Sequence, residues 1–254
     1  VLEILIDSFY PYKNTMPIKR NPYIRKLLYL VSVILLIALF VVLKQNQNKQ
    51  ICEKITIEID APIEKQLVTK RLINNQLNRW YVGGLLGISQ ANLSLPTIEK
   101  LIQQMPSVKK AEVSFDLRGE LLIEIKQRMP VMRVIPMYGT SYYVAKDFTQ
   151  IPAYVTEVAR VPIVNGNLTK AMIKKVYTLS TYVQENEFME ALTEQIFVDD
   201  NSDLVIIPKI KNQRIVIGDT TLIPEKFEKL ILFYQEGLNH IGWEKYHTIN
   251  LKYK

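Results

Sequence analysis

Histidine and cysteine are the side chains that proteins use most often for catalysis and metal binding, and this sequence has few of them. His240 and His247 are its two histidines, and no cysteine or carboxylate pattern surrounds them. A zinc site needs three or four ligands at compatible spacing. We therefore interpret both histidines as surface or interface residues and predict no metal site.

The single cysteine, Cys52, lies far along the sequence from both histidines, so nothing near it suggests activation as a nucleophile. One cysteine cannot form an internal disulfide bond, and the fold must be stable through its apolar core. We interpret Cys52 as an unreactive thiol in a linker. An intermolecular disulfide bond remains an open alternative.

Two short stretches resemble ligand-binding loops in composition only. Residues 199–203, DDNSD, lack the glycine and the final glutamate of a calcium loop, and we predict a polar hairpin turn there. Residues 82–89, VGGLLGIS, match neither a Walker loop nor a dinucleotide fingerprint, and we predict a flexible turn. From the sequence we therefore predict no catalytic residue and no cofactor, and we predict that the protein is not an enzyme.

The formal net charge of +7 raises the question of nucleic-acid binding. About three of these charges belong to the basic segment before residue 27, and the remaining Lys and Arg residues alternate with Glu and Asp. A nucleic-acid-binding surface needs clustered cations. We predict no nucleic-acid partner.

Residues 27–43, LLYLVSVILLIALFVVL, contain no charged side chain. As a helix this run spans about 25 Å, which is close to the thickness of a bilayer core. A buried core helix would show a polar stripe, and a signal peptide would end in a small-residue cleavage site. Neither is present, so we predict one transmembrane helix.

Charged residues on the two sides of this helix predict its orientation. Five Lys and Arg residues precede it, and fewer follow it, which places the N-terminus in the cytoplasm. We predict a cytoplasmic tail at 1–26, a linker at 44–53 and export of the rest. Met16 is a natural start, which would make 1–15 an upstream extension, but a start at Val1 stays open.

Residues 54–130 have the pattern of a small α/β module. Residues 54–60 alternate as a strand, a helix begins near Pro62, and a second short helix precedes Pro106. In the stretch from Pro106 to Pro130, two alternating runs flank a glycine, which predicts an antiparallel hairpin whose inner face includes Leu117. The order is strand, helix, helix, strand, strand.

Residues 131–254 alternate between short strands and longer helical patterns. Strands are predicted in VMRV, YYV, RVPIVNG and the stretch 195–219, and helices in 168–186 and 224–243. The chain then closes with a strand, YHTINLKYK. The predicted fold class is α+β: one transmembrane helix, a βααββ module and a mixed β-sheet domain with flanking helices.

The βααββ order, its position behind a membrane helix and the run "LSLPTIEKLIQQMPSVKKAEV" resemble a POTRA domain. With "YYV", "RVPIVNG", "IVIGD", "EKFEKL" and the terminal "INLKYK", the chain from about Met16 onward resembles the FtsQ/DivIB family of bacterial division proteins. Two departures stand out. The sequence "AKDFTQIP" lacks the family's glycine after the tyrosines, and no tail follows the last strand.

The terminal strand at 246–254 is the predicted binding element. A strand that ends a chain often lies at a sheet edge, where its unpaired backbone groups can accept a partner's strand. A fully covered internal strand is the open alternative. The resemblance places Tyr253 and Lys252 on the family's terminal aromatic and basic residues. The strand argument adds Leu251, Ile249 and Tyr246.

The resemblance implies the partners and the location. In that family the C-terminal strand and the helix before it bind the small division proteins FtsB and FtsL, and the POTRA domain takes part in recruitment to other divisome components. The expected function is a non-enzymatic scaffold that helps control septal peptidoglycan synthesis. The expected location is the bacterial inner membrane at the septum, in single-pass type II orientation. The alternative is a POTRA-bearing transport or secretion component.

Overall fold

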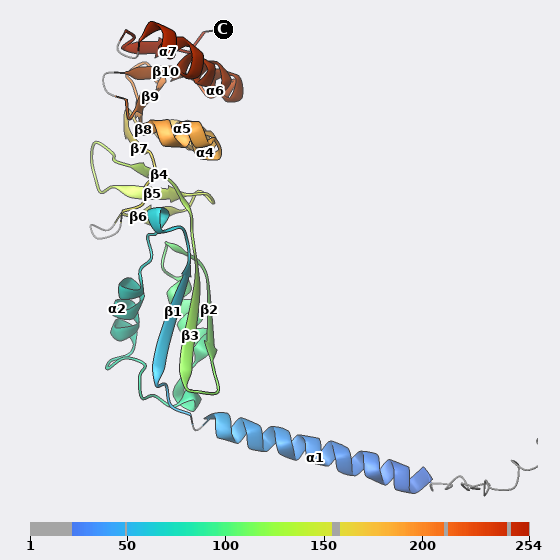
Figure 1. Cartoon of the computed structure of the whole chain (residues 1–254). Helices are drawn as coiled ribbons and strands as arrows, with labels where there is room; N and C mark the ends of the chain where they lie inside the picture. The colour runs from blue at the N-terminus through green and yellow to red at the C-terminus, as the bar shows by residue number, and fades with distance from the viewer. Residues whose placement is uncertain (1–21, 49, 154–157, 211–212, 243–244, 254) are drawn as a thin grey trace, which may run out of the picture. The chain divides into compact units, whose positions relative to one another are not determined.

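A computed structural model gives the structure of the chain, and Figure 1 shows it as a ribbon. The residues that it describes are 22–48, 50–153, 158–210, 213–242 and 245–253. The two alternative starts, Val1 and Met16, lie outside these residues. The chain forms two units, Val1–Lys49 and Gln50–Lys254, and each is described by itself.

In the described part of the first unit, residues 22–48, the chain forms the helix α1 (Pro22–Asn48), so the predicted helix at 27–43 is present. Its described side chains are those of Tyr23 and of residues 26–42, and all of them are exposed. Within the described residues, no helix combines the length and the apolarity that a membrane crossing requires. The crossing itself stays a prediction.

The second unit begins with a three-stranded sheet and its helices. In chain order these elements are β1 (Lys54–Asp60), η1 (Ile63–Lys65), α2 (Lys70–Trp80), η2 (Gln90–Asn92), α3 (Leu95–Gln103), β2 (Val108–Phe115) and β3 (Glu120–Gln127). The strand order is β1-β3-β2, with β1 parallel and β2 antiparallel to β3. The predicted order of two helices between one strand and a hairpin is therefore present.

Three local predictions in this part are wrong. Only the 3-10 turn η1 follows Pro62, and α2 begins at Lys70, because the side-chain carbonyl of Gln127 accepts hydrogen bonds from the amides of Leu67 and Val68 in between. Leu117 lies in the hairpin turn and is exposed. Cys52 is not in an exposed linker; it is buried in the core of this sheet, and burial raises the pKa of its thiol.

The second sheet has eight strands. The remaining elements are β4 (Pro130–Val134), β5 (Tyr142–Ala145), β6 (Gln150–Pro152), β7 (Ile163–Gly166), α4 (Lys170–Glu185), α5 (Glu187–Leu192), β8 (Thr193–Val198), β9 (Leu204–Pro208), β10 (Arg214–Gly218), α6 (Ile223–Leu232), η3 (Phe233–Gly237), α7 (Leu238–Ile241) and β11 (Thr248–Asn250). Their order in the sheet is β11-β10-β9-β8-β7-β4-β5-β6.

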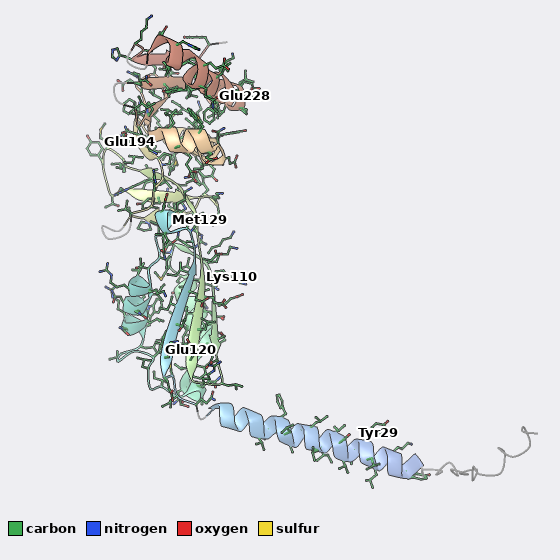
Figure 2. The ribbon with its side chains drawn as sticks, viewed as in Figure 1. Tyr29, Lys110, Glu120, Met129, Glu194 and Glu228 are labelled. Atoms are coloured by element: carbon green, nitrogen blue, oxygen red, sulfur yellow. The ribbon has the colours of Figure 1, made fainter. Side chains whose placement is uncertain are left out.

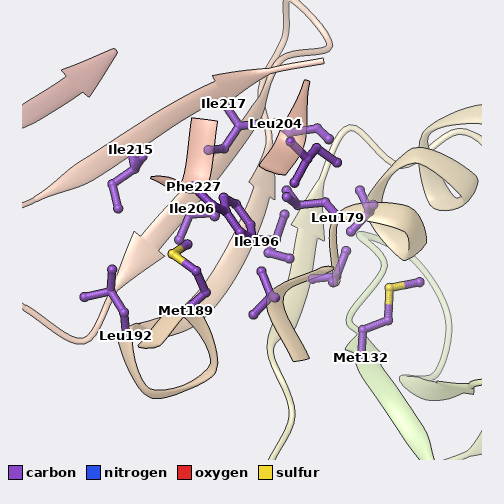
Figure 3. Close-up of a cluster of buried hydrophobic side chains, with 14 of the residues drawn as sticks. Met132, Leu179, Met189, Leu192, Ile196, Leu204, Ile206, Ile215, Ile217 and Phe227 are labelled. Atoms are coloured by element: carbon purple, nitrogen blue, oxygen red, sulfur yellow. The ribbon is translucent and has the colours of Figure 1, made fainter. Parts of the chain in front are cut away.

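The main core lies between this sheet and its helices, which contribute buried residues from α4, α5, α6, η3 and α7. Figure 3 shows Ile196, Ile206 and Ile217 from the strands facing Phe227 of α6. Thr169 caps α4 by accepting a hydrogen bond from the amide of Met172, as expected for a threonine just before a helix. The fold class is α+β, as predicted.

Candidate partner-binding edge

The C-terminal strand β11 lies at one edge of the eight-stranded sheet, next to β10. It is shorter than predicted: three residues are in strand conformation, where the sequence predicted a strand over 246–254. The amide of Lys252 binds the side chain of Asn250 rather than continuing the ladder. Strand conformation therefore ends at Asn250.

The composition of β11 differs from that of the other edge strands in the described part of the chain. β1 and β2 form the edges of the small sheet, and β6 forms the second edge of the large one. β1 and β2 carry several charged side chains, and β6 ends in Pro152, features by which proteins prevent edge-to-edge pairing. β11, with the sequence TIN, has neither a charge nor a proline.

The pairing of β11 with β10 determines which backbone groups remain available. The carbonyl of His247 accepts a hydrogen bond from the amide of Arg214 (2.9 Å), and the amide of Leu251 donates to the carbonyl of Val216 (2.8 Å). In a parallel ladder, alternate residues direct both groups toward the same neighbour. Thr248 and Asn250 therefore direct their amides and carbonyls toward the open side.

Ile249 and Leu251 attach β11 to the core. Ile249 is 9% exposed, and Leu251 packs against the same apolar cluster while remaining half-buried. Both side chains therefore face the domain interior. Their contacts are internal, so they position the strand.

Lys252 is held within the protein. Its Nζ lies 2.7 Å from Oδ2 of Asp203, which follows the β8–β9 turn, and the hydrogen bond to Asp203 raises the pKa of Lys252. A Cβ at Gly218 would lie 2.8 Å from Cγ of Lys252, so glycine leaves the space that the lysine stem occupies. Gly218 also has a φ of +80°, which favours glycine.

The two tyrosines near the C-terminus differ in their contacts. The ring of Tyr246 packs edge-to-face on Phe233 of η3, with centroids 5.6 Å apart. Tyr253 is 75% exposed, and the Nζ of Lys252 lies 5.9 Å from the centre of its ring. Of the five predicted binding residues, Tyr253 thus offers the largest free aromatic surface.

Side-chain hydrogen bonds fix the turn between β10 and α6, which follows the strand that pairs with β11. Lys226 is 8% exposed, and its Nζ donates hydrogen bonds to the carbonyl of Ile217 (2.9 Å) and to Oδ1 of Asp219 (3.2 Å). The hydroxyl of Thr221 also donates to Oδ1 of Asp219, at 2.5 Å. The Thr221 bonds, together with Lys226, lower the pKa of Asp219 to about 2.

The described residues offer little for catalysis. They contain no group of three or more histidine, cysteine or acidic side chains placed to hold a metal ion. His240 and His247 are both exposed, and Cys52 is buried in the other sheet. Residues 199–203 form the β8–β9 hairpin turn, as predicted, with the carboxylate of Asp199 accepting from the amides of Asn201 and Asp203.

Residues 129–254, which include the whole eight-stranded sheet and β11, match the family described as FtsQ/DivIB, C-terminal related. The chain belongs to the FtsQ/DivIB family. No curated protein matches the chain. The FtsQ/DivIB membership inferred from the sequence is therefore confirmed, and it rests on the second half of the chain.

Family membership determines the general role. FtsQ/DivIB proteins are bacterial cell-division proteins that are associated with the membrane at the septum and are generally not enzymes. This chain therefore has a role in cell division, in which it interacts with other division proteins.

Sequence reasoning missed the residues that hold the edge in place. Asp203, Gly218 and Phe233 contact the C-terminal segment, and Lys226 binds the turn that follows β10. The glycine ending a strand in "IVIGD" was a usable signal, because strand-terminal glycines often mark a close backbone approach. For the other three, no local pattern indicates the contact.

Proposed function

We propose that the protein is a non-enzymatic divisome scaffold that binds the FtsB/FtsL pair through β11 and links early and late septation proteins. The observation that supports this most is the open side of β11, where Thr248 and Asn250 direct backbone groups outward on an edge without charge or proline. A partner's strand added there would gain main-chain hydrogen bonds. Tyr253 would then provide a side-chain contact beside the new strand.

The scaffold also needs an attachment. We propose that α1 anchors the chain in the bacterial inner membrane at 27–43, with the tail at 1–26 in the cytoplasm and the second unit exported. The side chains of residues 26–42 support this, because they are exposed and carry no charge after Lys26. An apolar helix with no protein to cover it is stable in lipid.

The small sheet is the proposed recruitment module. Its order β1, α2, α3, β2, β3 between Lys54 and Gln127 supports its assignment as a POTRA domain covering 54–130, with the β domain at 131–254. We propose that it contacts other divisome components.

The side-chain contribution can be tested with Tyr253→Glu in the full chain. We expect binding of the FtsB/FtsL-like pair from the same bacterium to weaken at least about tenfold, since exposed aromatics at interfaces often contribute that much. Isothermal titration in detergent measures the affinity. Tyr138→Glu is the matched control, because Tyr138 is 86% exposed on the β4–β5 loop. Equal affinities for both variants would contradict a role for Tyr253.

The backbone contribution needs a different substitution. Thr248→Pro removes an amide that is directed to the open side and leaves the pairing of His247 and Leu251 with β10 in place. We expect weaker partner binding with a nearly unchanged unfolding midpoint. Thr248→Ala, which keeps the amide, should bind like the wild type. If Thr248→Pro folds and binds normally, strand addition at β11 is wrong.

A further inference from the structure

Several large apolar side chains are exposed at the end of the small sheet where the second unit begins. Ile51 is 48% exposed, Leu86 is 59% exposed and Leu117 is 71% exposed. Val82, in the same loop as Leu86, is 99% exposed. Single exposed apolar residues are ordinary, but a group of them marks a contact surface.

Backbone hydrogen bonds connect the loop of Leu86 to the segment that carries Ile51. The amide of Cys52 donates to the carbonyl of Ile88 (2.9 Å), and the amide of Gly87 donates to the carbonyl of Cys52 (2.8 Å). Ile51 itself forms a bridge with Ser89. The loop 82–89 therefore lies directly beside residues 50–53.

The β2–β3 turn lies on the other side of the same segment. The amide of Glu53 donates to the carbonyl of Gly119 (2.9 Å), and the side-chain amide of Gln50 donates to the carbonyl of Leu117. A Cβ at Gly119 would lie only 2.7 Å from the carbonyl oxygen of Ile51. Ile51 thus lies between the two loops that carry Leu86 and Leu117, and we call these three residues the apolar tip.

Internal contacts fix both loops. In the turn, Oδ1 of Asp116 accepts hydrogen bonds from the amides of Arg118 and Glu120, each at 2.8 Å. In the other loop, Leu85 is 1% exposed, so it anchors the loop in the core while its neighbour Leu86 faces outward. The exposure of the apolar tip is therefore a property of ordered turns.

The charges around the tip come close to cancelling. Lys54 pairs with Glu120 at 2.9 Å, and Arg118, with a side chain that is 92% exposed, lies 3.9 Å from Asp116. Glu53 is an exposed carboxylate beside them. An occupant of this surface is consequently selected by apolar contact more than by charge.

The length of chain between α1 and the tip limits what that occupant can be. The charge-free run ends at residue 43, and α1 ends at Asn48. Five helical residues and three residues at full extension span at most about 18 Å between residue 43 and Ile51. The headgroup region begins where the apolar part of an anchored helix ends, so the tip stays within reach of it.

We propose that the apolar tip, Ile51, Leu86 and Leu117, inserts into the headgroup region of the bilayer that holds α1. This inference rests on the proposed membrane anchor and adds a second, peripheral contact to it. The contact would hold the start of β1 and the β2–β3 turn at the lipid surface. The opposite end of β3, where the chain passes to Met129, would then point away from the membrane (Figure 2).

The test uses the full chain in phosphatidylcholine/phosphatidylglycerol vesicles and a polarity-sensitive fluorophore on an introduced cysteine. Cys52 is buried, so it does not compete for labelling of the folded protein. Leu117→Cys and Leu86→Cys carry the probe at the tip. Met137→Cys is the control, because Met137 is 80% exposed on the β4–β5 loop, beyond the length of β3.

We expect doxyl-labelled lipids to quench the probes at positions 117 and 86 about twofold or more, as for side chains inserted at an interface, and to leave position 137 unquenched. Vesicle flotation of the same samples reports whether α1 is anchored. Floating vesicles with unquenched tip probes would overturn this inference alone. A chain that does not float would overturn the anchor and this inference together.

A second variant guards against an effect of the labels themselves. With the probe at Glu53→Cys, next to the tip, the double substitution Leu86→Ser with Leu117→Ser should reduce quenching about twofold, because the inserted apolar surface is lost. Both positions are in exposed turns, so the fold should persist. Unchanged quenching in the double variant would show that these two leucines do not insert.

Discussion

Both sheets of the second unit end in a parallel strand that comes from elsewhere in the sequence, yet the two strands differ in strength. β1 pairs with β3 over seven residues, with Ile57 buried in the core. β11 pairs with β10 over three residues and depends on Ile249 and on side-chain contacts from Asp203 and Phe233.

The difference in ladder length shows two roles that an edge strand can have: β1 is part of a stable sheet, and β11 has the features of a site for a partner strand. β1 carries charged residues and a long ladder, so it contributes to stability and its edge discourages further pairing. β11 has a short ladder and a neutral edge, and short peripheral elements open locally at low free-energy cost. A partner strand on its open side would add the hydrogen bonds that β11 lacks.

Removing the central isoleucine of each strand should produce the largest and most unequal effects. We expect Ile57→Ala to lower the free energy of unfolding by about 3 kcal/mol, because it leaves a cavity in a closed core. Ile249→Ala should cost about 1 kcal/mol, since water and neighbours can fill a site at the edge. Urea denaturation of both variants measures this. Equal losses would remove the distinction between the two strands.

The next largest effect concerns the turn between β10 and α6. Lys226→Met leaves the carbonyl of Ile217 without its buried donor, which should cost about 2 kcal/mol. Lys229→Met, an exposed lysine on the same helix, should change stability little. Denaturation midpoints measure both. A neutral Lys226→Met would mean that the buried hydrogen bond to Ile217 does not stabilise the fold.

The same turn predicts an acid-dependent contribution to stability. The pKa of Asp219 falls from 3.8 to about 2 on folding, so its stabilising effect is present above about pH 4 and is lost as the pH falls through 2. The stability difference between the wild type and Asp219→Asn should therefore narrow as the pH is lowered. Thermal unfolding across this range tests it. A stability difference between the wild type and Asp219→Asn that stays constant with pH would contradict the stabilising effect of the hydrogen bonds to Asp219.

The smallest effect should come from the ion pair that fixes the chain after β11. Asp203→Asn should speed hydrogen exchange at the Leu251 amide while leaving global stability almost unchanged, because the pair is partly solvated. Asp200→Asn, an exposed residue in the same turn, is the control. An identical exchange rate in Asp203→Asn and Asp200→Asn would exclude this ion pair as the contact that holds the chain after β11.

The same ion pair depends on pH. The raised pKa of Lys252 means that the pair stabilises the fold below about pH 10.5 and that this stabilisation is lost above it.

Period-two alternation correctly predicted the β2–β3 hairpin, and helical spacing of apolar residues predicted α4 and α6. These patterns are local, since they report one buried face within a single element. The start of α2 was not predictable, because Gln127, about sixty residues later, holds the preceding segment in another conformation. Leu117 was misplaced because alternation does not show where a strand ends and its turn begins.

The sequence by itself determined the α+β class, the order of most elements, the family and the position of a strand close to the C-terminus. Only the tertiary structure decided that this strand lies at an edge, that it has three residues, and that Lys252 binds Asp203. The reason is that strand order and ion pairing depend on contacts between residues far apart in the chain. Local periodicity carries no information about such contacts.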